Sequence, residues 1–333
     1  MAVTFSIPHS RRAGHSRRRW LRIAIVGCLL ALTVLVCLSK PFRAGIAYLR
    51  SLEAFAPLAE EPQIRSEPGI EELAHEVMRH YRAAIAVVER EHGLPFAEPP
   101  TVYVCATPES FEKHTSYSSA VKALTIGDRI FLNPAMVLQK PRVVGLLTHE
   151  MSHEHLIQRV GSYAYMAHLP EWFREGLATY VSGGGGAEEV SEDEAARAIL
   201  AGDVFEPESS GRILLCRGRQ SRMPPHVFYR QSMMFVRYLK ELDHQAWRSL
   251  LGAIQNGEDF AAAFEQAYGT AVKTVFSRFV EREKVTATKS GHFRQSCWVL
   301  SFPSPPDLVA VTFHPPSAVS PGRHLVEVVA RAK

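Results

Sequence analysis

Hydrophobic residues recur every three to four positions through most of the middle of the chain. From Ile70 to about Glu91 the apolar positions, Val77 and Tyr81 among them, fall on one helical face, and Gly93 follows as a stop signal. The same spacing predicts further helices at about 141–158, 170–182, 190–201, 226–241, 244–255, 258–267 and 270–284. We therefore expect residues 70–285 to be mainly helical.

A few segments carry the pattern of β-strands instead. "TVYVCA" (101–106) alternates apolar and polar residues, and "RIFLN" (129–133) is a second strand-like run. Residues 40–69, punctuated by prolines, are expected to form a linker. From about Val285 the strand-like runs "CWVLSF", "DLVAVTF" and "HLVEVVA" form either a small β appendage or a loosely attached tail. The predicted fold is α+β, with a small, mostly antiparallel sheet and a helical lobe after it.

The N-terminus combines a basic cluster with an apolar segment. Residues 1–22 hold six arginines and no acidic residue, whereas the whole chain carries +4, so the remainder sums to −2. The 17 uncharged residues Ile23–Ser39 predict a transmembrane signal-anchor. The arginines place its N-terminal side in the cytoplasm and the rest of the chain outside the cell membrane. A cleavable signal peptide is the alternative, although Cys37-Leu38-Ser39 fits a cleavage site poorly.

The folded part of the chain shows no basic excess, so nucleic-acid binding is not expected. Its strongest chemical signal is "LLTHEMSHEH" (146–155). His149 and His153 are four residues apart, so on a helix they face the same way and can share one metal ion. Zinc suits imidazole nitrogens and tolerates an open coordination position. Glu150 lies about 100° further round the helix, where it could take a proton from a zinc-bound water.

A polar patch on an ordinary helix is the other interpretation of this segment, and a third ligand decides between the two. Two residues beyond His153, His155 points away from the shared face. We expect His155 and His168 at the surface or in a loop.

Downstream, "LPEWFREGLATYVSGG" contains Trp172, Glu175, Gly176 and Ala178 in the pattern W-x-x-E-G-x-A. Together with HEMSH, this segment resembles the gluzincin zinc metallopeptidases, which have a peptidase MA-like domain. The resemblance implies that Glu175 completes a site for one Zn²⁺ ion, with Glu171 as the second choice. The small residues of the pattern are expected to let this helix approach the motif helix closely.

A further segment, "FYRQSMMFVRYL" (228–239), resembles the helix that follows the metal site in aminopeptidase-like gluzincins. The resemblance implies that Tyr229 donates its hydroxyl to the oxyanion, although Ser232 stands where those enzymes commonly have glycine. His226 is an alternative donor. The strand at 126–132 is implied to pair along its edge with an extended substrate. No G-x-M-E-N segment occurs, so an aminopeptidase is not expected.

The sequence therefore predicts a membrane-anchored, extracytoplasmic zinc peptidase that acts on a peptide or protein substrate. The expected segments are a basic cytoplasmic part (1–22), the anchor (23–39), the linker (40–69), the metallopeptidase-like domain (70–285) and a proline-rich tail (286–333). Two alternatives remain. One is a zinc-bound, non-proteolytic peptide-binding module, and the other is a zinc hydrolase of a non-peptide envelope amide.

Overall fold

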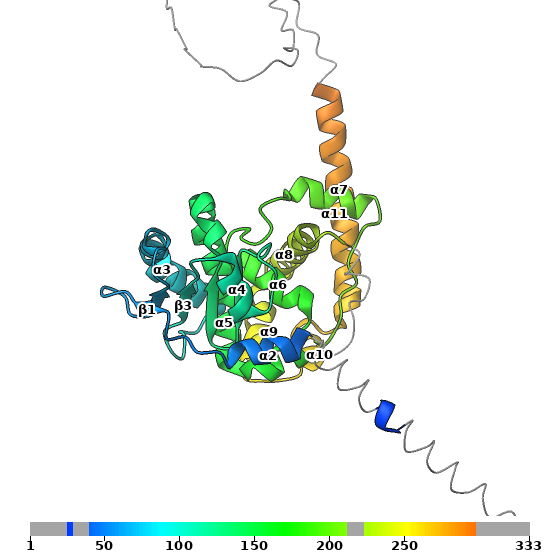
Figure 1. Ribbon diagram of the computed structural model, residues 1–333. Helices are drawn as coiled ribbons and strands as arrows, with labels where there is room; N and C mark the ends of the chain where they lie inside the picture. The colour runs from blue at the N-terminus through cyan, green and yellow to red at the C-terminus, as the bar shows by residue number, and fades with distance from the viewer. Residues whose placement is uncertain (1–24, 29–39, 212–222, 298–333) are drawn as a thin grey trace, which may run out of the picture. The chain divides into compact units, whose positions relative to one another are not determined.

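The computed structural model describes residues 25–28, 40–211 and 223–297 (Figure 1). The metal-site elements described below belong to a compact unit that ends at Lys289. The helices are α2 (Lys40–Tyr48), α3 (Glu71–His92), α4 (Pro108–Thr115), α5 (Lys140–His168), α6 (Glu171–Val181), α7 (Glu192–Leu200), α8 (Pro225–Leu242), α9 (His244–Gln255), α10 (Phe260–Tyr268) and α11 (Val272–Cys297). A 3-10 turn, Pro134–Gln139, leads into α5.

The strands form one five-stranded mixed sheet in the order β1-β2-β3-β5-β4. They are β1 (Ala56–Pro57), β2 (Ile64–Ser66), β3 (Thr101–Val104), β4 (Ala123–Ile126) and β5 (Arg129–Leu132). The outer strands β1 and β4 pair antiparallel with their neighbours, whereas β2–β3 and β3–β5 pair in parallel. The expectation of a mostly antiparallel sheet is thus wrong, because α3 links β2 to β3 as a crossover and parallel strands need such connections.

Alternating side chains of the strands divide the core between the two faces of the sheet. Val102 and Val104 of β3 belong to the main hydrophobic core, which also contains residues of α3 and α5. Tyr103 between them packs in a smaller cluster with Phe131 of β5 and Phe111 of α4. This is the period of two that a strand imposes, so both faces of the sheet are covered.

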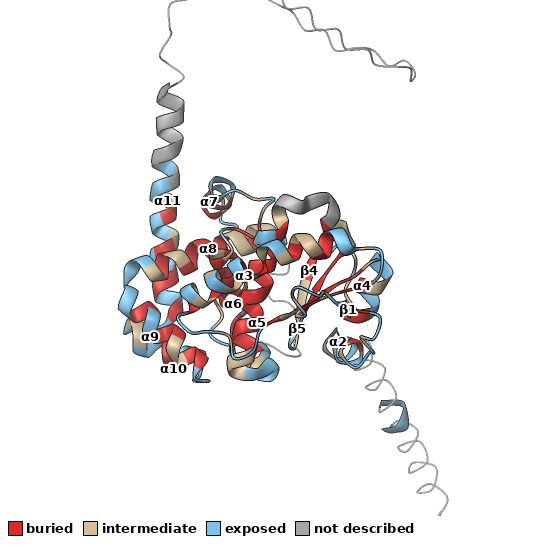
Figure 2. Ribbon diagram, turned by 90° about the vertical axis from the view of Figure 1, so that its left-hand side faces the viewer, coloured by how far each residue is buried: buried red, intermediate tan, exposed pale blue. Residues whose placement is uncertain are grey.

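Helix α5 lies at the centre of the unit and contacts α3, α6 and β4. Every residue from 146 to 157 is buried, as the red colour of α5 in Figure 2 shows. Near its end the helix is interrupted at Gly161, where φ is 78° and ψ is 153°. The predicted motif helix, 141–158, matches the part before this kink.

Helix α6 lies directly against α8. A Cβ atom added to Gly176 would come within 2.7 Å of the backbone oxygen of Ser232, so the close approach requires glycine. The small residue therefore serves the packing of α6 on α8, rather than on the motif helix as expected. Glu175, the neighbour of Gly176, is positioned by this contact.

Two expected boundaries differ from those in the structure. Residues 40–69, expected as a linker, contribute α2 and the strands β1 and β2, whose two and three residues are too few to show a periodic pattern. Helix α11 continues to Cys297, past the point where strand-like character was expected to begin. The rest of the strand-like tail lies outside the described residues.

The predicted anchor at 23–39 also lies outside the described residues, apart from 25–28. In the part of the chain that the structure describes, none of the helices has both the length and the apolar character that crossing a bilayer requires.

Candidate metal centre

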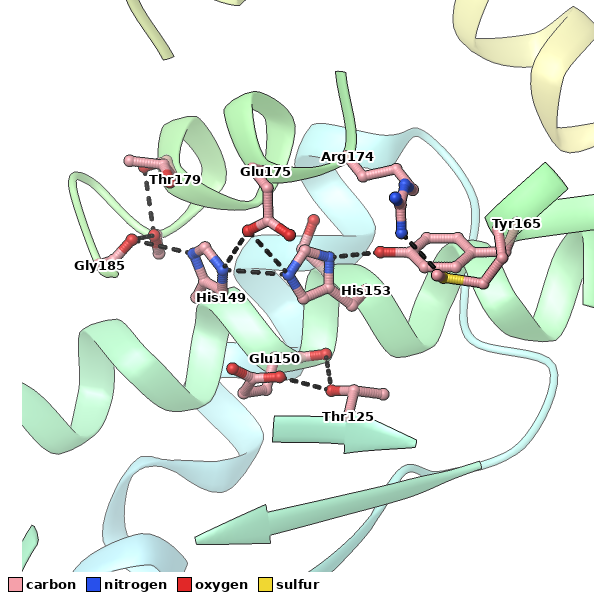
Figure 3. Close-up of polar contacts among 12 residues, drawn as sticks. Thr125, His149, Glu150, His153, Tyr165, Arg174, Glu175, Thr179 and Gly185 are labelled. Atoms are coloured by element: carbon pink, nitrogen blue, oxygen red, sulfur yellow. Dashed lines mark hydrogen bonds and ion pairs between the residues drawn. The ribbon is translucent and has the colours of Figure 1, made fainter. Parts of the chain in front are cut away.

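Three of the predicted ligands converge at the contact of α5 with α6. Ligand atoms of His149, His153 and Glu175 all lie within 4.8 Å of one another. The Nε2 atoms of the two histidines are 3.0 Å apart, and Glu175 Oε2 is 3.4 Å from His149 Nε2 and 3.6 Å from His153 Nε2 (Figure 3). Both histidines are buried, and the glutamate side chain is 16 % exposed. The predicted set of two histidines and one glutamate is therefore assembled in the structure.

The loop after α6 holds the ring of His149. Its Nδ1 lies 2.9 Å from the backbone oxygen of Gly185, and because a carbonyl can only accept, Nδ1 carries the proton. Gly186 packs so closely on this ring that an added Cβ would lie 2.9 Å from its Cε1 atom. Gly185 and Gly186, the last two residues of the glycine run 183–186, thus fit around a histidine of the candidate metal centre.

Tyr165, which follows the kink of α5 at Gly161, contacts the second histidine, His153. Its hydroxyl oxygen lies 2.7 Å from His153 Nδ1. When Nδ1–H donates to this oxygen, Nε2 keeps its lone pair, as a metal ligand must. Nothing in the spacing of the sequence indicates Tyr165, because Gly161 interrupts the helical register between the two residues.

This donor set fits zinc. With a proton on Nδ1 of each histidine, both Nε2 lone pairs point toward each other and toward the Glu175 carboxylate. While both imidazoles are neutral, three electron-rich atoms at this spacing repel one another unless a proton or a metal ion lies among them. Two imidazole nitrogens, one carboxylate oxygen and an adjoining cavity match the composition of catalytic zinc sites.

Charges within the centre stabilise each other in the metal-free chain. Burial alone lowers the pKa of His149, but the hydrogen bond to Glu175 and the charges of Glu150 and Glu175 outweigh it and raise this pKa. Burial acts to raise the pKa of Glu175, yet the two histidines hold it well below its ordinary value. Glu175 is therefore ionised at neutral pH, ready to act as a ligand.

Glu150 faces the edge strand β4 rather than the two histidines. The hydroxyl of Thr125 on β4 lies 2.7 Å from Glu150 Oε2 and 3.1 Å from the backbone oxygen of the same residue (Figure 3). Both oxygens accept, so Thr125 is the donor to the predicted base. Thr125 was not predicted from the sequence, because the strand that carries it was expected to begin at residue 126 rather than at 123.

A cavity of about 690 Å³ adjoins the centre and is lined by the two histidines, Glu150 and Glu175. Tyr229, the fifth residue of α8, lines it with its ring centre 6.2 Å from that of His149. The charge of Glu175, followed by burial, raises the pKa of Tyr229 well above its ordinary value. Its hydroxyl therefore stays protonated and can donate.

Other candidates lie near the centre without joining it. His226 lines the cavity, with its Nε2 3.6 Å from a carboxylate oxygen of Glu189. Glu171, the second choice for a ligand, also lines the cavity but is not part of the converging group. His168 is exposed as expected, whereas His155 is fully buried, its Nδ1 3.0 Å from that of His92.

The strand expected to bind substrate needs a correction. Residues 126–132 span the end of β4, a turn and β5, and β5 lies inside the sheet between β3 and β4. On this side the sheet ends at the edge strand β4, and residues 120–125 line the cavity. The edge strand beside the candidate metal centre is therefore β4, which precedes β5 in the chain.

Comparison with known proteins adds nothing to these observations. No protein-family profile matches the chain, and no curated protein matches it.

Proposed function

We propose that this protein is a zinc-dependent peptidase. One observation carries the proposal: the converging His149, His153 and Glu175 side chains border the same cavity as Glu150 and Tyr229. A structural zinc site has four protein ligands and no open side. Here three ligands are assembled beside a cavity, which leaves room for water and substrate.

The surrounding residues divide the chemistry of hydrolysis among them. A bound zinc ion would supply Lewis acidity toward a water molecule and the substrate carbonyl. Glu150, which accepts a hydrogen bond from Thr125 and lines the cavity, would accept the proton of the attacking water and pass it to the leaving amine. Tyr229 would donate its hydroxyl to the carbonyl oxygen as negative charge develops there. The edge of β4 offers backbone groups to an extended peptide.

The test combines zinc content with peptide hydrolysis in the purified full chain. We expect about one zinc per chain in the wild type and in Glu171→Ala, but loss or marked weakening of zinc binding in Glu175→Ala. Glu150→Gln should retain zinc and lose hydrolysis of a mixed peptide library. Absence of zinc from the wild type after metal is supplied would refute the proposal.

The other outcomes separate the alternative functions. Zinc binding without peptide hydrolysis, in a chain that still retains peptides, would identify a binding module. Hydrolysis of a cell-envelope amide but of no peptide would identify a different hydrolase. We also propose, from the arginine cluster and the apolar run at 23–39, that a membrane tether holds the domain outside the cytoplasm. Protease accessibility of the domain in intact cells tests this location.

A further inference from the structure

Arg174 is a buried arginine that forms no ion pair with the described residues. It lines the cavity of the metal centre and is 9 % exposed. Its Nε atom has no hydrogen-bond partner, and its Nη1 contacts the sulfur of Met166 at 3.0 Å, a weak acceptor. Among the ion pairs of the described residues, none involves Arg174.

These contacts do not replace the hydrogen bonds to water that the guanidinium group of Arg174 loses on burial. Its carbon Cζ lies 4.8 Å from the centre of the Tyr165 ring, and a cation–π contact of this kind offsets only part of the cost of burial. A buried charge costs more than this unless it is paired and hydrogen-bonded. Glu175, the next residue in the chain, already contacts the two histidines, so it does not supply the missing partner.

The position of Arg174 indicates what would pair with it. Tyr165, on which the guanidinium stacks, reaches His153 through its hydroxyl at 2.7 Å. Figure 3 shows Arg174 and Tyr165 beyond His153, on the side opposite Gly185 and His149. An extended peptide advances about 3.3 Å per residue, so a group one or two residues from the scissile bond would come near this guanidinium.

We propose that Arg174 binds the C-terminal carboxylate of the substrate, so that the enzyme releases one or two residues from the C-terminus of peptides. A carboxylate matches the fork of guanidinium N–H donors and neutralises the buried charge, which a peptide carbonyl cannot do. The reaction itself is unchanged: water adds across the peptide bond and yields a carboxylate and an amine. This inference rests on the proposed peptidase function and specifies its substrate class.

The test measures binding rather than turnover. In zinc-loaded, full-length Glu150→Gln, the dissociation constants of N-acetyl-trialanine with a free C-terminal carboxylate and of its C-terminal amide are compared by calorimetry. We expect the acid to bind about tenfold more tightly than the amide, as a charged hydrogen-bonded pair implies. In Glu150→Gln/Arg174→Met the two peptides should bind equally, and in Glu150→Gln/Arg174→Lys part of the preference should remain.

Arg142 provides a matched control, because it lines the same cavity. Glu150→Gln/Arg142→Met should keep the preference for the acid. Equal binding of acid and amide by Glu150→Gln, or a preference that survives in Glu150→Gln/Arg174→Met, overturns the inference. A merely structural role for Arg174 would weaken both peptides alike.

Zinc content, measured on the same samples, separates this inference from the proposed function. Zinc present without a preference for the acid refutes the carboxylate site alone. If the chain contains no zinc but still binds the peptide acid more tightly than the amide through Arg174, the proposed peptidase function is refuted. Arg174 would then belong to a carboxylate-binding site without peptidase activity.

Discussion

The hydrogen bond from Thr125 to Glu150 fixes the direction of the predicted catalytic base. At 2.7 Å it joins the edge strand β4 to the motif helix α5, so the carboxylate is oriented by the strand that would also bind substrate. Thr125→Val removes the donor and keeps the shape of the side chain. We expect kcat to fall by about tenfold with little change in KM, because the bond orients the base rather than the substrate.

Thr125→Ser is the control for that variant, since it restores the hydroxyl and should recover most of the activity. Zinc content should be the same in both variants and in the wild type. Wild-type kcat in Thr125→Val, together with a fall in Thr125→Ser, would show that the methyl group matters rather than the hydrogen bond.

Tyr165 contacts His153 and would act on a bound metal ion through it. The hydroxyl at 2.7 Å from Nδ1 orients the ring, and partners of this kind commonly change metal affinity by about 10–100-fold. Tyr165→Phe should therefore weaken zinc binding by that factor in a competition with a chelator of known affinity. Tyr163→Phe, two residues earlier and 72 % exposed, should bind zinc like the wild type. Equal affinities in all three chains would contradict the assigned role of Tyr165.

Glu154 gives helix α5 a pH-dependent stability. The side chain is fully buried, and although Gln158 donates to one oxygen at 3.0 Å, the other oxygen has no partner. Burial raises the pKa of Glu154 from 4.5 to about 7. Between these values the folded chain binds more protons at this residue than the unfolded chain, so the free energy of unfolding falls as the pH rises.

Glu154→Gln removes this dependence. We expect the variant to be more stable than the wild type at pH 8, by up to about 3 kcal/mol, and the gain to disappear near pH 4.5. Urea unfolding midpoints of both chains at several pH values measure the difference. Glu265→Gln, at an exposed position of α10, should show no such trend. A gain that is independent of pH would mean that ionisation of Glu154 is not its source.

At the scale of elements, the contact of α6 with α8 sets the position of the third ligand. A methyl group on Gly176 would meet the backbone oxygen of Ser232 at 2.7 Å, and backbone cannot rotate away. Gly176→Ala should therefore separate the helices and lower the free energy of unfolding by about 1–3 kcal/mol. Because Glu175 is adjacent, zinc affinity should fall as well.

Gly252→Ala is the matched control for this effect. Gly252 lies within α9, and an added Cβ would meet nothing within 4 Å. There alanine should stabilise the chain by about 0.5–1 kcal/mol through helix propensity alone. Thermal unfolding of both variants compares them, and stabilisation by Gly176→Ala would contradict the packing described.

The sequence predicts a feature of these elements when that feature depends on contacts between residues close together in the chain. The spacing of His149 and His153 on one turn is a local property, and the structure confirms that their Nε2 atoms meet. The hydrogen bond of Tyr165 depends on a kink at Gly161 whose direction no periodicity encodes. Strand β4 has one buried and three half-buried residues, so it lacks the alternation that would have revealed the edge.

The order of the strands in the sheet likewise depends on contacts between residues that are distant in the sequence. Short strands such as β1 and β2 were hidden in a proline-rich stretch, where composition favours a linker. Their pairing is settled by residues distant in sequence, such as Val102 opposite Ile64. Helices α3, α6, α8 and α9 were predicted closely because each buries a stripe that repeats over several turns, whereas α5 and α11 continue past their predicted ends.

At the scale of the whole compact unit, the metal centre connects two groups of elements. Helix α5, with two ligands, packs on α3 and the sheet, whereas α6, with the third ligand, packs on α8. Without a cation, the contact between the ligands rests on the attraction of Glu175 for the two histidines. A bound ion would replace this attraction with three coordination bonds that span the contact.

Zinc should therefore stabilise the fold as a whole. At free zinc about a hundredfold above its Kd, binding to the folded chain alone adds about 2.7 kcal/mol to the free energy of unfolding, or roughly 5–10 °C in Tm. Calorimetric scans with buffered zinc and with a chelator measure the shift. Glu175→Ala should respond weakly or not at all, while Glu171→Ala should respond like the wild type. A wild-type Tm that is independent of zinc would show that the three side chains are not a metal site, because any ligand specific for the folded state must raise its stability.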